Sequence, residues 1–509
     1  MSSTLREATP DTVGVEPRAD EGGLTPTPPG IGRAAVRGVL WSYAAFVGSK
    51  LALFASTVVL ARLLAPDDFG VMSLSLAIMT YVDALNDFGI GQAIIYLDRD
   101  DETTASTAFV MTMATGIAAA AVVAFSAAPM ARLFNEPDLV PIMRILALSY
   151  VLVSLSAVHS ARLRRMMNFR RRVVPELAKS AVKAVVSVGF AAAGFGVWSL
   201  VWGQLAGVAV STIVYWKALP WRPRWNFDRD TARQILTYGG GMMLVTFLAV
   251  VARDVDYLIV GQRLGAAELG RYTLGFRLPD LVLMGVTYAV SEAFFPALSR
   301  LRAGGTALRS TYLRAVSALA LVTAPLGVGI AVIAQDFVHV AYGERWATTA
   351  PVLSLISLYF IAQSIVFVAG DVYKALGRQR ILWIITAARL VVTVVVLLLV
   401  ADRGIVAVAA AQTALVGAGC VVQLAIAARL IGAGVRPLLN ALRPAAVGVA
   451  VLVPAAMGTH ALLEGAAPAL RLTLVTLAGG AAYLVTVYFS GRVIVDELRA
   501  TLRRRPVVV

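Results

Sequence analysis

Residues 60–70 read LARLLAPDDFG and join two long apolar stretches. An arginine, a proline, two aspartates and a glycine fall within this short segment, which is typical of a turn. Two hundred residues later the chain reads VGQRLGAAELG over 260–270, again between two apolar stretches. Three positions match at this offset: Leu64 with Leu264, Asp68 with Glu268, and Gly70 with Gly270. The two segments therefore predict an internal repeat.

A second pair of turns supports the repeat. One turn runs from Gly196 to Gln204 and the other from Gly404 to Gln412, so the glycine and the glutamine have the same spacing in both. The basic loops that precede them match at the same offset, FRRRV at 169–173 with GRQRI at 377–381. A unit that is repeated in the same orientation has an even number of membrane spans. We predict two parallel six-helix bundles followed by two C-terminal helices.

The composition is that of a membrane protein. Apolar residues make up 59% and charged residues 15% of the 509 residues, against roughly 45–50% and about 25% in soluble domains. Apolar stretches of about twenty residues recur along the chain, and each is long enough to cross a bilayer as a helix. We therefore predict an all-α polytopic protein with about 14 transmembrane helices. The expected spans are 36–64, 69–97, 104–128, 139–160, 173–194, 197–217, 235–262, 269–297, 311–335, 349–371, 381–401, 404–428, 441–460 and 470–490.

The charges of the loops predict the orientation of these spans. Alternate loops are rich in arginine, as in ARLRRMMNFRRR and WKALPWRPRWNFDRDTAR, whereas the loops between them carry few cations. The positive-inside rule places both termini in the cytoplasm of a multi-pass protein of the plasma (inner) membrane. The predicted segments are a disordered tail (1–32), two six-helix bundles (33–217 and 218–430), two extra helices (431–490) and a basic tail (491–509).

Several function classes are disfavoured by the sequence. The net charge of +15 is explained by the loop arginines, so we expect no nucleic-acid partner. Cys420 is the only cysteine, and the three histidines lie far apart without metal-ligand spacing, so we expect no metal site and no cofactor. The GIGQA segment at 89–93 lies inside a span without a βαβ context, and no Walker A motif is present. We find no catalytic residues and predict a protein that is not an enzyme.

Charged residues inside the predicted spans are the candidates for function, because a charge at mid-membrane costs about 2.5–3.5 kcal/mol on insertion scales. Lys50, Lys183 and Arg389 have no acid one helical turn away. Together with Arg253 they are candidates for a water-filled cavity that binds an anionic substrate. The alternative is that they form ion pairs with acids on other helices.

The acids inside the spans have two interpretations. Asp83 and Asp87 in the second span are candidates for sites of a coupling ion or proton. The remaining candidates for coupling or for internal ion pairs are Asp254, Asp256, Arg277 and Asp280. Two pairs have the i,i+3 spacing that suits an ion pair on one helix: Arg253 with Asp256, and Arg277 with Asp280.

Four blocks of the sequence resemble the polysaccharide-export flippases, the Wzx-like members of the multidrug/oligosaccharidyl-lipid/polysaccharide (MOP) superfamily. They are LARLLAPDDFGVMSL, NDFGIGQAIIY (86–96), DYLIVGQRLGAAELGRY (256–272) and FFPALSR (294–300). The resemblance implies two bundles around a central cavity and the movement of a polyprenyl-(pyro)phosphate-linked oligosaccharide from the inner to the outer leaflet. It also implies an architectural role for the matched positions Asp256, Gly261, Leu269, Gly270, Tyr272 and Pro296.

Other functions remain open at this point. A MATE-like drug or cation antiporter would favour acids in the cavity, and a lipid-II-type flippase would carry a peptidoglycan precursor. A membrane-bound glycan polymerase or ligase is disfavoured because no outer loop is long enough for a catalytic domain. The expected partners are the lipid-linked oligosaccharide, membrane lipids and the machinery of polysaccharide polymerases and glycosyltransferases. Coupling to a gradient of H⁺ or Na⁺ is left open.

Overall fold

The computed structural model describes residues 48–86, 90, 102–166, 169–301 and 305–490. These residues fold into helices joined by short connections, and no strand is found among them. The two predicted tails, 1–32 and 491–509, and the candidate Asp87 lie outside the described residues. The all-helical fold predicted from the sequence is confirmed.

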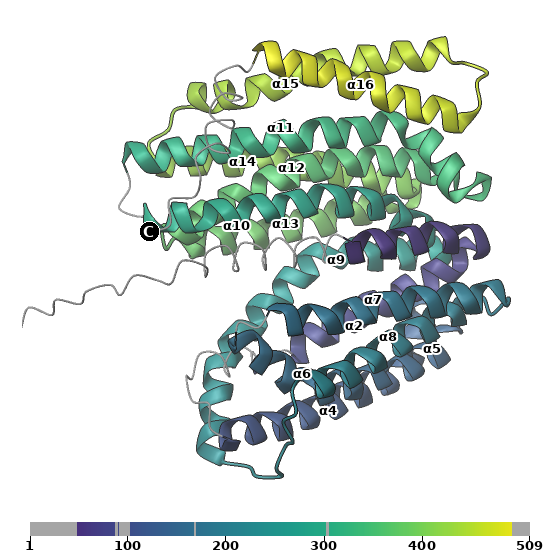
Figure 1. Cartoon of the computed structure of the whole chain (residues 1–509), viewed down its shortest axis with the longest axis vertical. Coiled ribbons are helices and arrows are strands. Elements are labelled where there is room, and N and C mark those ends of the chain that lie inside the picture. The colour runs from purple at the N-terminus through teal and green to yellow at the C-terminus, as the bar shows by residue number, and fades with distance from the viewer. Residues whose placement is uncertain (1–47, 87–89, 91–101, 167–168, 302–304, 491–509) are drawn as a thin grey trace, which may run out of the picture.

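The helices form two groups, seen one below the other in Figure 1. Residues 48–63 are helical and precede the lower group, which comprises α2 (Pro66–Asn86), α4 (Glu102–Phe134), α5 (Leu139–Leu146), α6 (Leu148–Arg165), α7 (Phe169–Ala192) and α8 (Val197–Ala218). The helix α9 (Arg229–Pro279) starts beside α4 and α6 of the lower group, where Ala232 and Ile235 pack with Phe109 and Val158, and runs from there into the upper group (Figure 1). The rest of the upper group comprises η1 (Asp280–Met284), α10 (Gly285–Arg300), α11 (Thr306–Phe337), η2 (Val338–Tyr342), η3 (Glu344–Trp346), α12 (Thr349–Ala375), α13 (Gln379–Val400), η4 (Ala401–Arg403), α14 (Ile405–Leu430), α15 (Val435–Leu462) and α16 (Pro468–Ser490).

The long helix α9 contains the second of the two repeated turns. It bends at Gly265, whose φ of 82° and ψ of 177° are not helical. Glycine adopts a positive φ without the steric cost that a Cβ would add. The spans predicted at 235–262 and 269–297 meet at this bend, so the expected boundary between them is present although no loop separates them.

Ten helices of the described residues are long and apolar enough to cross a membrane. Four of the fourteen spans predicted from the sequence are not among these ten. They correspond to residues 48–63, to α7, to α9 before its bend and to the helix that continues from the bend into α10. These four segments carry most of the charged candidate residues, and their charges lower their mean hydropathy. The protein is a multi-pass membrane protein, and the number of fourteen spans stays a prediction.

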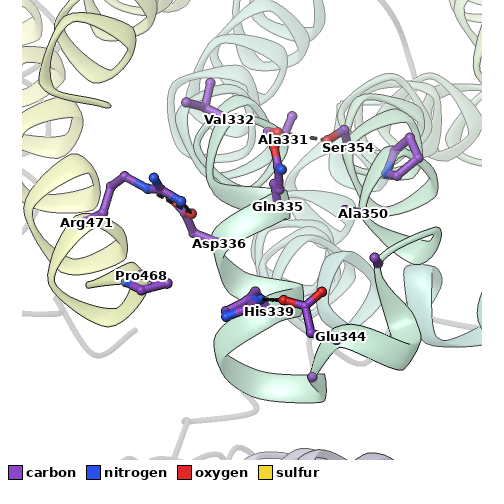
Figure 2. A pocket seen from close by; sticks show the side chains of 13 residues that line it. Ala331, Val332, Gln335, Asp336, His339, Glu344, Ala350, Ser354, Pro468 and Arg471 are labelled. Carbon is purple, nitrogen blue, oxygen red and sulfur yellow. Dashed lines mark hydrogen bonds and ion pairs between the residues drawn. The ribbon is translucent and has the colours of Figure 1, made fainter. Parts of the chain in front are cut away.

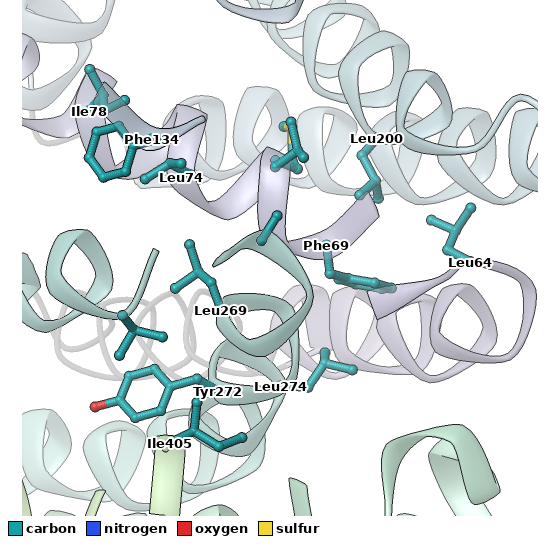
Figure 3. Close-up of a cluster of buried hydrophobic side chains, with 14 of the residues drawn as sticks. Leu64, Phe69, Leu74, Ile78, Phe134, Leu200, Leu269, Tyr272, Leu274 and Ile405 are labelled. Carbon is teal, nitrogen blue, oxygen red and sulfur yellow. The ribbon is translucent and has the colours of Figure 1, made fainter. Parts of the chain in front are cut away.

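One large hydrophobic cluster joins the two groups of helices. It contains residues from the turn after residue 63, from α2, α8, α9 and α14, including Leu64, Phe69, Leu74, Leu200, Leu269, Tyr272 and Ile405 (Figure 3). The ring of Phe69 meets the ring of Trp346 edge-on at 5.4 Å between centroids. Apolar burial thus holds the first repeated turn against the second half of the chain.

The glycines of the two repeated turns allow this close approach. A Cβ on Gly70 would lie 1.8 Å from the carbonyl oxygen of Ala266, and a Cβ on Gly270 would lie 2.0 Å from that of Pro66. Each turn thus packs its glycine against the backbone of the other, in a reciprocal arrangement. We call the end of the molecule that carries these two turns the hairpin end. The repeat was predicted from the sequence, but this contact between its two copies was not.

Candidate functional site

Charged side chains inside the spans remain exposed in the structure. Lys50 on the helix of residues 48–63, Asp83 on α2, Arg253 and Arg277 on α9, and Asp280 in η1 are all exposed. Exposed charges at membrane depth are tolerated where they face water or one another, because hydrocarbon cannot solvate them. These positions therefore point to a polar space rather than to lipid.

Several of these charges act on one another across the two groups of helices. Lys183 on α7 lies close enough to Arg277, Lys179 and Lys50 to be affected by their positive charges. Asp280 lies close enough to Arg277, Lys50 and Arg253 for their positive charges to act on its carboxylate. We call Lys50, Lys183, Arg253, Arg277 and Asp280 the charged cluster. It draws on both halves of the chain and contains more cations than acids.

The position of Lys183 follows from the close packing of α7 on α8. A Cβ on Gly203 would lie 1.9 Å from the hydroxyl oxygen of Ser187, and a Cβ on Gly207 would lie 2.8 Å from the carbonyl oxygen of Lys179. The absent side chains let the two helices approach each other, as small residues do in membrane bundles. Lys183 then donates a hydrogen bond to Gln204 Oε1 at 2.7 Å.

The predicted ion pair between Arg253 and Asp256 is wrong. Arg253 pairs instead with its neighbour Asp254, with Nε 2.7 Å from Oδ1 and Nη2 2.8 Å from Oδ2. Asp256 lies on the buried face of α9, where it accepts a hydrogen bond of 2.8 Å from the Tyr272 hydroxyl. A guanidinium on that face would lose its water, so the exposed Arg253 pairs with the acid that lies nearer the surface.

Asp256 is surrounded by groups that can stabilise a buried carboxylate. It is 1% exposed, and the side chain of Gln412 lies beside it in addition to Tyr272. Tyr272, Tyr257 and Phe276 form a set of mutually contacting rings around this position. The position is thus built into the second group of helices rather than into the space between the groups.

Arg277 and Asp280 are placed by an irregular stretch of helix. They flank Pro279, and the chain continues as the π-helical turn η1 from Asp280 to Met284. π-helical turns are rare in proteins, but those that occur are often found at functional sites. Arg277 and Asp280 are within range of each other's charge, so their proximity agrees with the spacing argument.

Two predicted site residues have neighbours outside the charged cluster. Arg389 on α13 donates a hydrogen bond of 3.1 Å to Gln363 Oε1 on α12, and the charges that act on Lys183 and Asp280 come from other residues. Asp83 interacts with the hydroxyl of Tyr150, which lies on α6. The structure therefore brings together Lys50, Lys183 and Arg253, while the charge of Arg389 acts on Tyr359, which the charge of Asp280 also reaches.

The hairpin end is held together by two arginines that cross between the halves. Arg62 donates hydrogen bonds to three successive carbonyls of η2, those of His339 (3.3 Å), Val340 and Ala341 (3.0 Å). In return Arg345 donates to the carbonyls of Leu64 (3.1 Å) and Arg62 (3.3 Å). Carbonyls at the end of a helix lack partners within it, so each half satisfies carbonyls of the other.

The indole of Trp346 completes this contact. Its Nε1 donates a hydrogen bond of 2.8 Å to the carbonyl of Ala61, and the residue is fully buried. We call residues 338–346 the strap, because they lie across the end of the first helix. The strap and the two glycine contacts close the hairpin end of the molecule.

A family of known proteins matches this region. The family model described as polysaccharide biosynthesis protein matches residues 59–351, which is more than half of the chain. The chain belongs to this family. The match begins at the first repeated turn and ends just beyond the strap, so it includes Arg253, Arg277 and the contacts that close the hairpin end.

Two relatives are similar to this chain over about two thirds of its length. It is 25% identical over 353 residues to the lipopolysaccharide biosynthesis protein WzxC of Escherichia coli (strain K12), covering 68% of this chain and 71% of the relative. It is also 25% identical over 336 residues to the succinoglycan biosynthesis transport protein ExoT of Rhizobium meliloti (strain 1021), covering 65% and 67%.

The fold of this family member is found in solved structures. The lipid II flippase MurJ in an inward closed conformation superimposes with a TM-score of 0.74 at 14% identity, covering 90% of this chain and all of that chain. At this level of identity the likeness concerns the fold. It agrees with the resemblance to the MOP superfamily that the sequence blocks indicated.

Sequence reasoning missed several residues that hold the site and its closed end. Gln204 and Gln412 marked the second repeated turn, and each contacts a charged residue, Lys183 or Asp256. The equal spacing of glycine and glutamine in the two turns was a signal of this shared role. Arg62, Arg345 and Trp346 carried no such signal, because their partners are backbone carbonyls nearly three hundred residues away.

Proposed function

We propose that this member of the polysaccharide biosynthesis family is a flippase. It moves a polyprenyl-(pyro)phosphate-linked oligosaccharide from the cytoplasmic to the outer leaflet for the synthesis of a cell-surface polysaccharide. The relatives WzxC and ExoT are named for lipopolysaccharide biosynthesis and for succinoglycan biosynthesis transport. The proposal is therefore a transport function rather than an enzymatic one.

The observation that carries the proposal is the charged cluster. An oligosaccharide linked to pyrophosphate loses hydrogen bonds and solvation of its charges if it enters hydrocarbon. Lys50, Lys183, Arg253 and Arg277 would replace water around such an anionic headgroup, while the prenyl chain remains in lipid. The exposure of Lys50, Arg253 and Arg277, and the proximity of the four cations across the two halves, fit a headgroup that sits between the halves.

The closed hairpin end supports transport by alternating access. We assign this end to the outer side, because the arginine-rich loops lie at the other end and positive loops face the cytoplasm. In this assignment both termini are cytoplasmic and the protein lies in the plasma (inner) membrane. The contacts through Gly70, Gly270 and the strap would then separate when the outer side opens.

The two groups of helices would act as the moving parts. We propose bundles of residues 33–217 and 218–430 that rock about each other, with residues 431–490 as two additional helices. This division follows the internal repeat, since parallel repeats in transporters commonly form separate halves around one site. Glycosyltransferases of the same pathway would supply the lipid-linked oligosaccharide, and polymerases would consume it.

We propose Asp256 as the candidate group for coupling to an ion gradient. It is buried, accepts a hydrogen bond from Tyr272 and lies beside the side chain of Gln412, and no cationic side chain pairs with it among the described residues. A buried carboxylate is costly when charged, so a proton or a cation beside it lowers that cost. The position is a coupling candidate and not a substrate contact.

The experiment that tests the function is depletion of the protein in cells that need a surface polysaccharide. The expected result is lipid-linked oligosaccharide that accumulates on the cytoplasmic leaflet, where an enzyme added to intact cells or spheroplasts cannot reach it. If the precursor still reaches the outer leaflet at the normal rate in depleted cells, the proposal is wrong.

The charge of the cluster also separates this proposal from its alternatives. A drug or cation antiporter would require a site dominated by acids, whereas the cluster contains four cations against Asp280 and the Asp254 that pairs with Arg253. A lipid II flippase remains an alternative because its substrate is also a lipid-linked pyrophosphate. Depletion distinguishes it, since loss of lipid II transport stops peptidoglycan synthesis, whereas loss of another polysaccharide leaves it intact.

A further inference from the structure

A second polar site lies at the hairpin end, away from the charged cluster. It is a cavity of about 530 Å³ between α11, α12, the strap and the first turn of α16 (Figure 2). Apolar residues form much of its wall, namely Ala331, Val332, Ala347, Ala350, Pro351 and Pro468. Polar groups form about as much of the wall as apolar ones, so the cavity suits a ligand that has both polar and apolar faces.

One wall of the cavity is a buried ion pair. Asp336 on α11 is 2% exposed, and Arg471 Nε lies 2.9 Å from each of its carboxylate oxygens. His460 Nε2 lies 3.6 Å from Oδ2 of the same carboxylate. Because these groups satisfy one another, the pair forms a rigid wall and contributes no net charge to the cavity.

Other polar groups of the cavity are available to a ligand. The amide of Gln335 lines the cavity, is exposed, and makes no hydrogen bond to another described residue. Glu344 pairs with His339, but its side chain is 76% exposed and keeps acceptor capacity. Figure 2 shows Gln335 on α11 and His339 on η2, with Glu344 beside His339. An amide and a carboxylate together offer both donors and acceptors.

The balance of charge excludes one class of ligand. With Asp336 paired with Arg471, the other carboxylate of the cavity wall is that of Glu344, which the imidazole of His339 contacts. A phosphate or a uronic acid would meet this carboxylate, and the only arginine of the wall, Arg471, is already paired with Asp336. A neutral or amine-bearing ligand with several hydroxyl groups meets no such repulsion.

We propose that this cavity binds a single neutral or amine-bearing sugar unit. Hydroxyl groups of the sugar would pair with Gln335 and Glu344, and its apolar C–H face would lie against the alanine and proline wall. The site is separate from the charged cluster and differs from it in the charge of its ligand. The proposal goes beyond flipping, because it concerns sugar recognition at the closed end.

The cavity shares a wall with the contacts that close the hairpin end. The side chain of His339 lines the cavity, while its carbonyl accepts a hydrogen bond from Arg62 of the other half. Gly343 lines the cavity as well, and a Cβ there would lie 3.3 Å from Arg62 Nη1. A sugar in the cavity therefore favours the strap in its closed position. By linkage, loosening the strap weakens sugar binding.

The test is binding of defined sugars to the purified full-length protein in lipid nanodiscs, measured by calorimetry. The probes are methyl glucoside, glucosamine and glucuronate. We expect the first two to bind and glucuronate to bind more weakly. Gln335→Ala and Glu344→Gln should each raise the Kd about tenfold, as expected for a lost hydrogen bond in a partly enclosed site. Arg62→Ala should raise it by a smaller factor.

The controls separate this site from the proposed flippase site. Asp138→Asn removes an exposed carboxylate elsewhere at the hairpin end, and Lys50→Ala alters the charged cluster; both should leave the Kd unchanged. The proposal is overturned if none of the sugars binds, if glucuronate binds best, or if Gln335→Ala and Glu344→Gln bind like the parent. If Lys50→Ala fails to flip its substrate but binds the sugars with the normal Kd, the proposed sugar site is supported independently of the flippase site.

Discussion

Gly70 and Gly270 allow two segments two hundred residues apart to touch through their backbones. Each lies where a Cβ would overlap a carbonyl oxygen of the other turn. Backbone atoms cannot move aside as the end of a flexible side chain can. A methyl group at either position therefore destabilises the closed arrangement of the hairpin end. It does not disturb the helix that contains the substituted residue.

We predict that Gly70→Ala opens the hairpin end. Overpacking of this kind costs about 1–3 kcal/mol, enough to raise the open population roughly tenfold. With the only cysteine, Cys420, replaced by alanine, a cysteine at the buried position Leu64 reports opening through its reaction with a membrane-impermeant maleimide. Gly189→Ala is the matched control, because a Cβ there has no neighbour within 4 Å. Equal labelling of the two variants would contradict the prediction.

Glu136 lies in the connection between α4 and α5, outside the spans, and responds to the closed arrangement. Partial burial raises its pKa above the ordinary value for a glutamate, the backbone N–H of Ala266 opposes this, and the charges of Asp67 and Asp138 add to it. A raised pKa in the folded state means that its contribution to stability is full below the unfolded pKa. That contribution is lost as the pH rises through the folded pKa.

We predict that Glu136→Gln stabilises the protein at neutral pH and has less effect at acidic pH. Glutamine keeps an acceptor for the Ala266 N–H but carries no charge to be buried or repelled. Thermal unfolding followed from about pH 4, near the ordinary glutamate pKa, to pH 7 should show a higher Tm for the variant, with the difference growing as the pH rises. Glu464→Gln, at an exposed glutamate of another connection, serves as the control. A Tm difference that shrinks as the pH rises would refute the assignment.

At the scale of helices, the hairpin end is closed by exchange of hydrogen bonds between helix ends. Arg62, in the last turn of the first helix, donates to the carbonyls of η2, and Arg345 of the strap donates to the carbonyls at the end of the first helix. These bonds exist only while the two halves are together. They therefore stabilise the closed state specifically, in contrast to bonds made within one half.

We predict that the double variant Arg62→Ala/Arg345→Ala favours the open state more than either single variant does. Each arginine is exposed, so we expect about 1 kcal/mol for each, within the range of net hydrogen-bond contributions. The labelling of Leu64→Cys should then increase several-fold in each single variant and more than tenfold in the double. Arg263→Ala provides the comparison, since Arg263 pairs at 3.4 Å with Asp402 of the same half. If Arg263→Ala opens the end equally, the exchange of hydrogen bonds is not what closes it.

The sequence predicts these elements unevenly, for physical reasons. Apolar length locates most of the spans, and the repeat aligns the two turns, because both depend on local sequence. The π-helical turns η1 and η2 and the bend at Gly265 depend on packing between distant segments. The pairing of Arg253 with Asp254 depends on which face of α9 is buried, and spacing alone cannot distinguish this from a pair with Asp256.

At the scale of the whole molecule, the charged cluster and the hairpin end form one system. The helix of residues 48–63 carries Lys50 and ends at Arg62, while α9 carries Arg253 and Arg277 and contains the repeated turn. Under the proposed alternating access, movement of these helices at the hairpin end would change the spacing of the charges. This connection explains why the helices with the most charge are also those that meet across the two halves.

We predict that removing cations from the cluster impairs transport more than removing acids. Lys50→Ala and Arg277→Ala each remove a charge placed to contact a pyrophosphate, and a charge-assisted contact of about 1.5 kcal/mol corresponds to roughly tenfold in transport rate. Asp280→Asn should have a smaller effect or none, because it removes a negative charge near an anionic substrate. The measurement is the rate at which lipid-linked oligosaccharide reaches the outer leaflet in cells that contain only the variant. Lys217→Ala, at an exposed lysine at the end of α8, controls for loss of positive charge as such. If Asp280→Asn abolishes transport while Lys50→Ala and Arg277→Ala retain the normal rate, the cluster serves a cation and the site belongs to an antiporter.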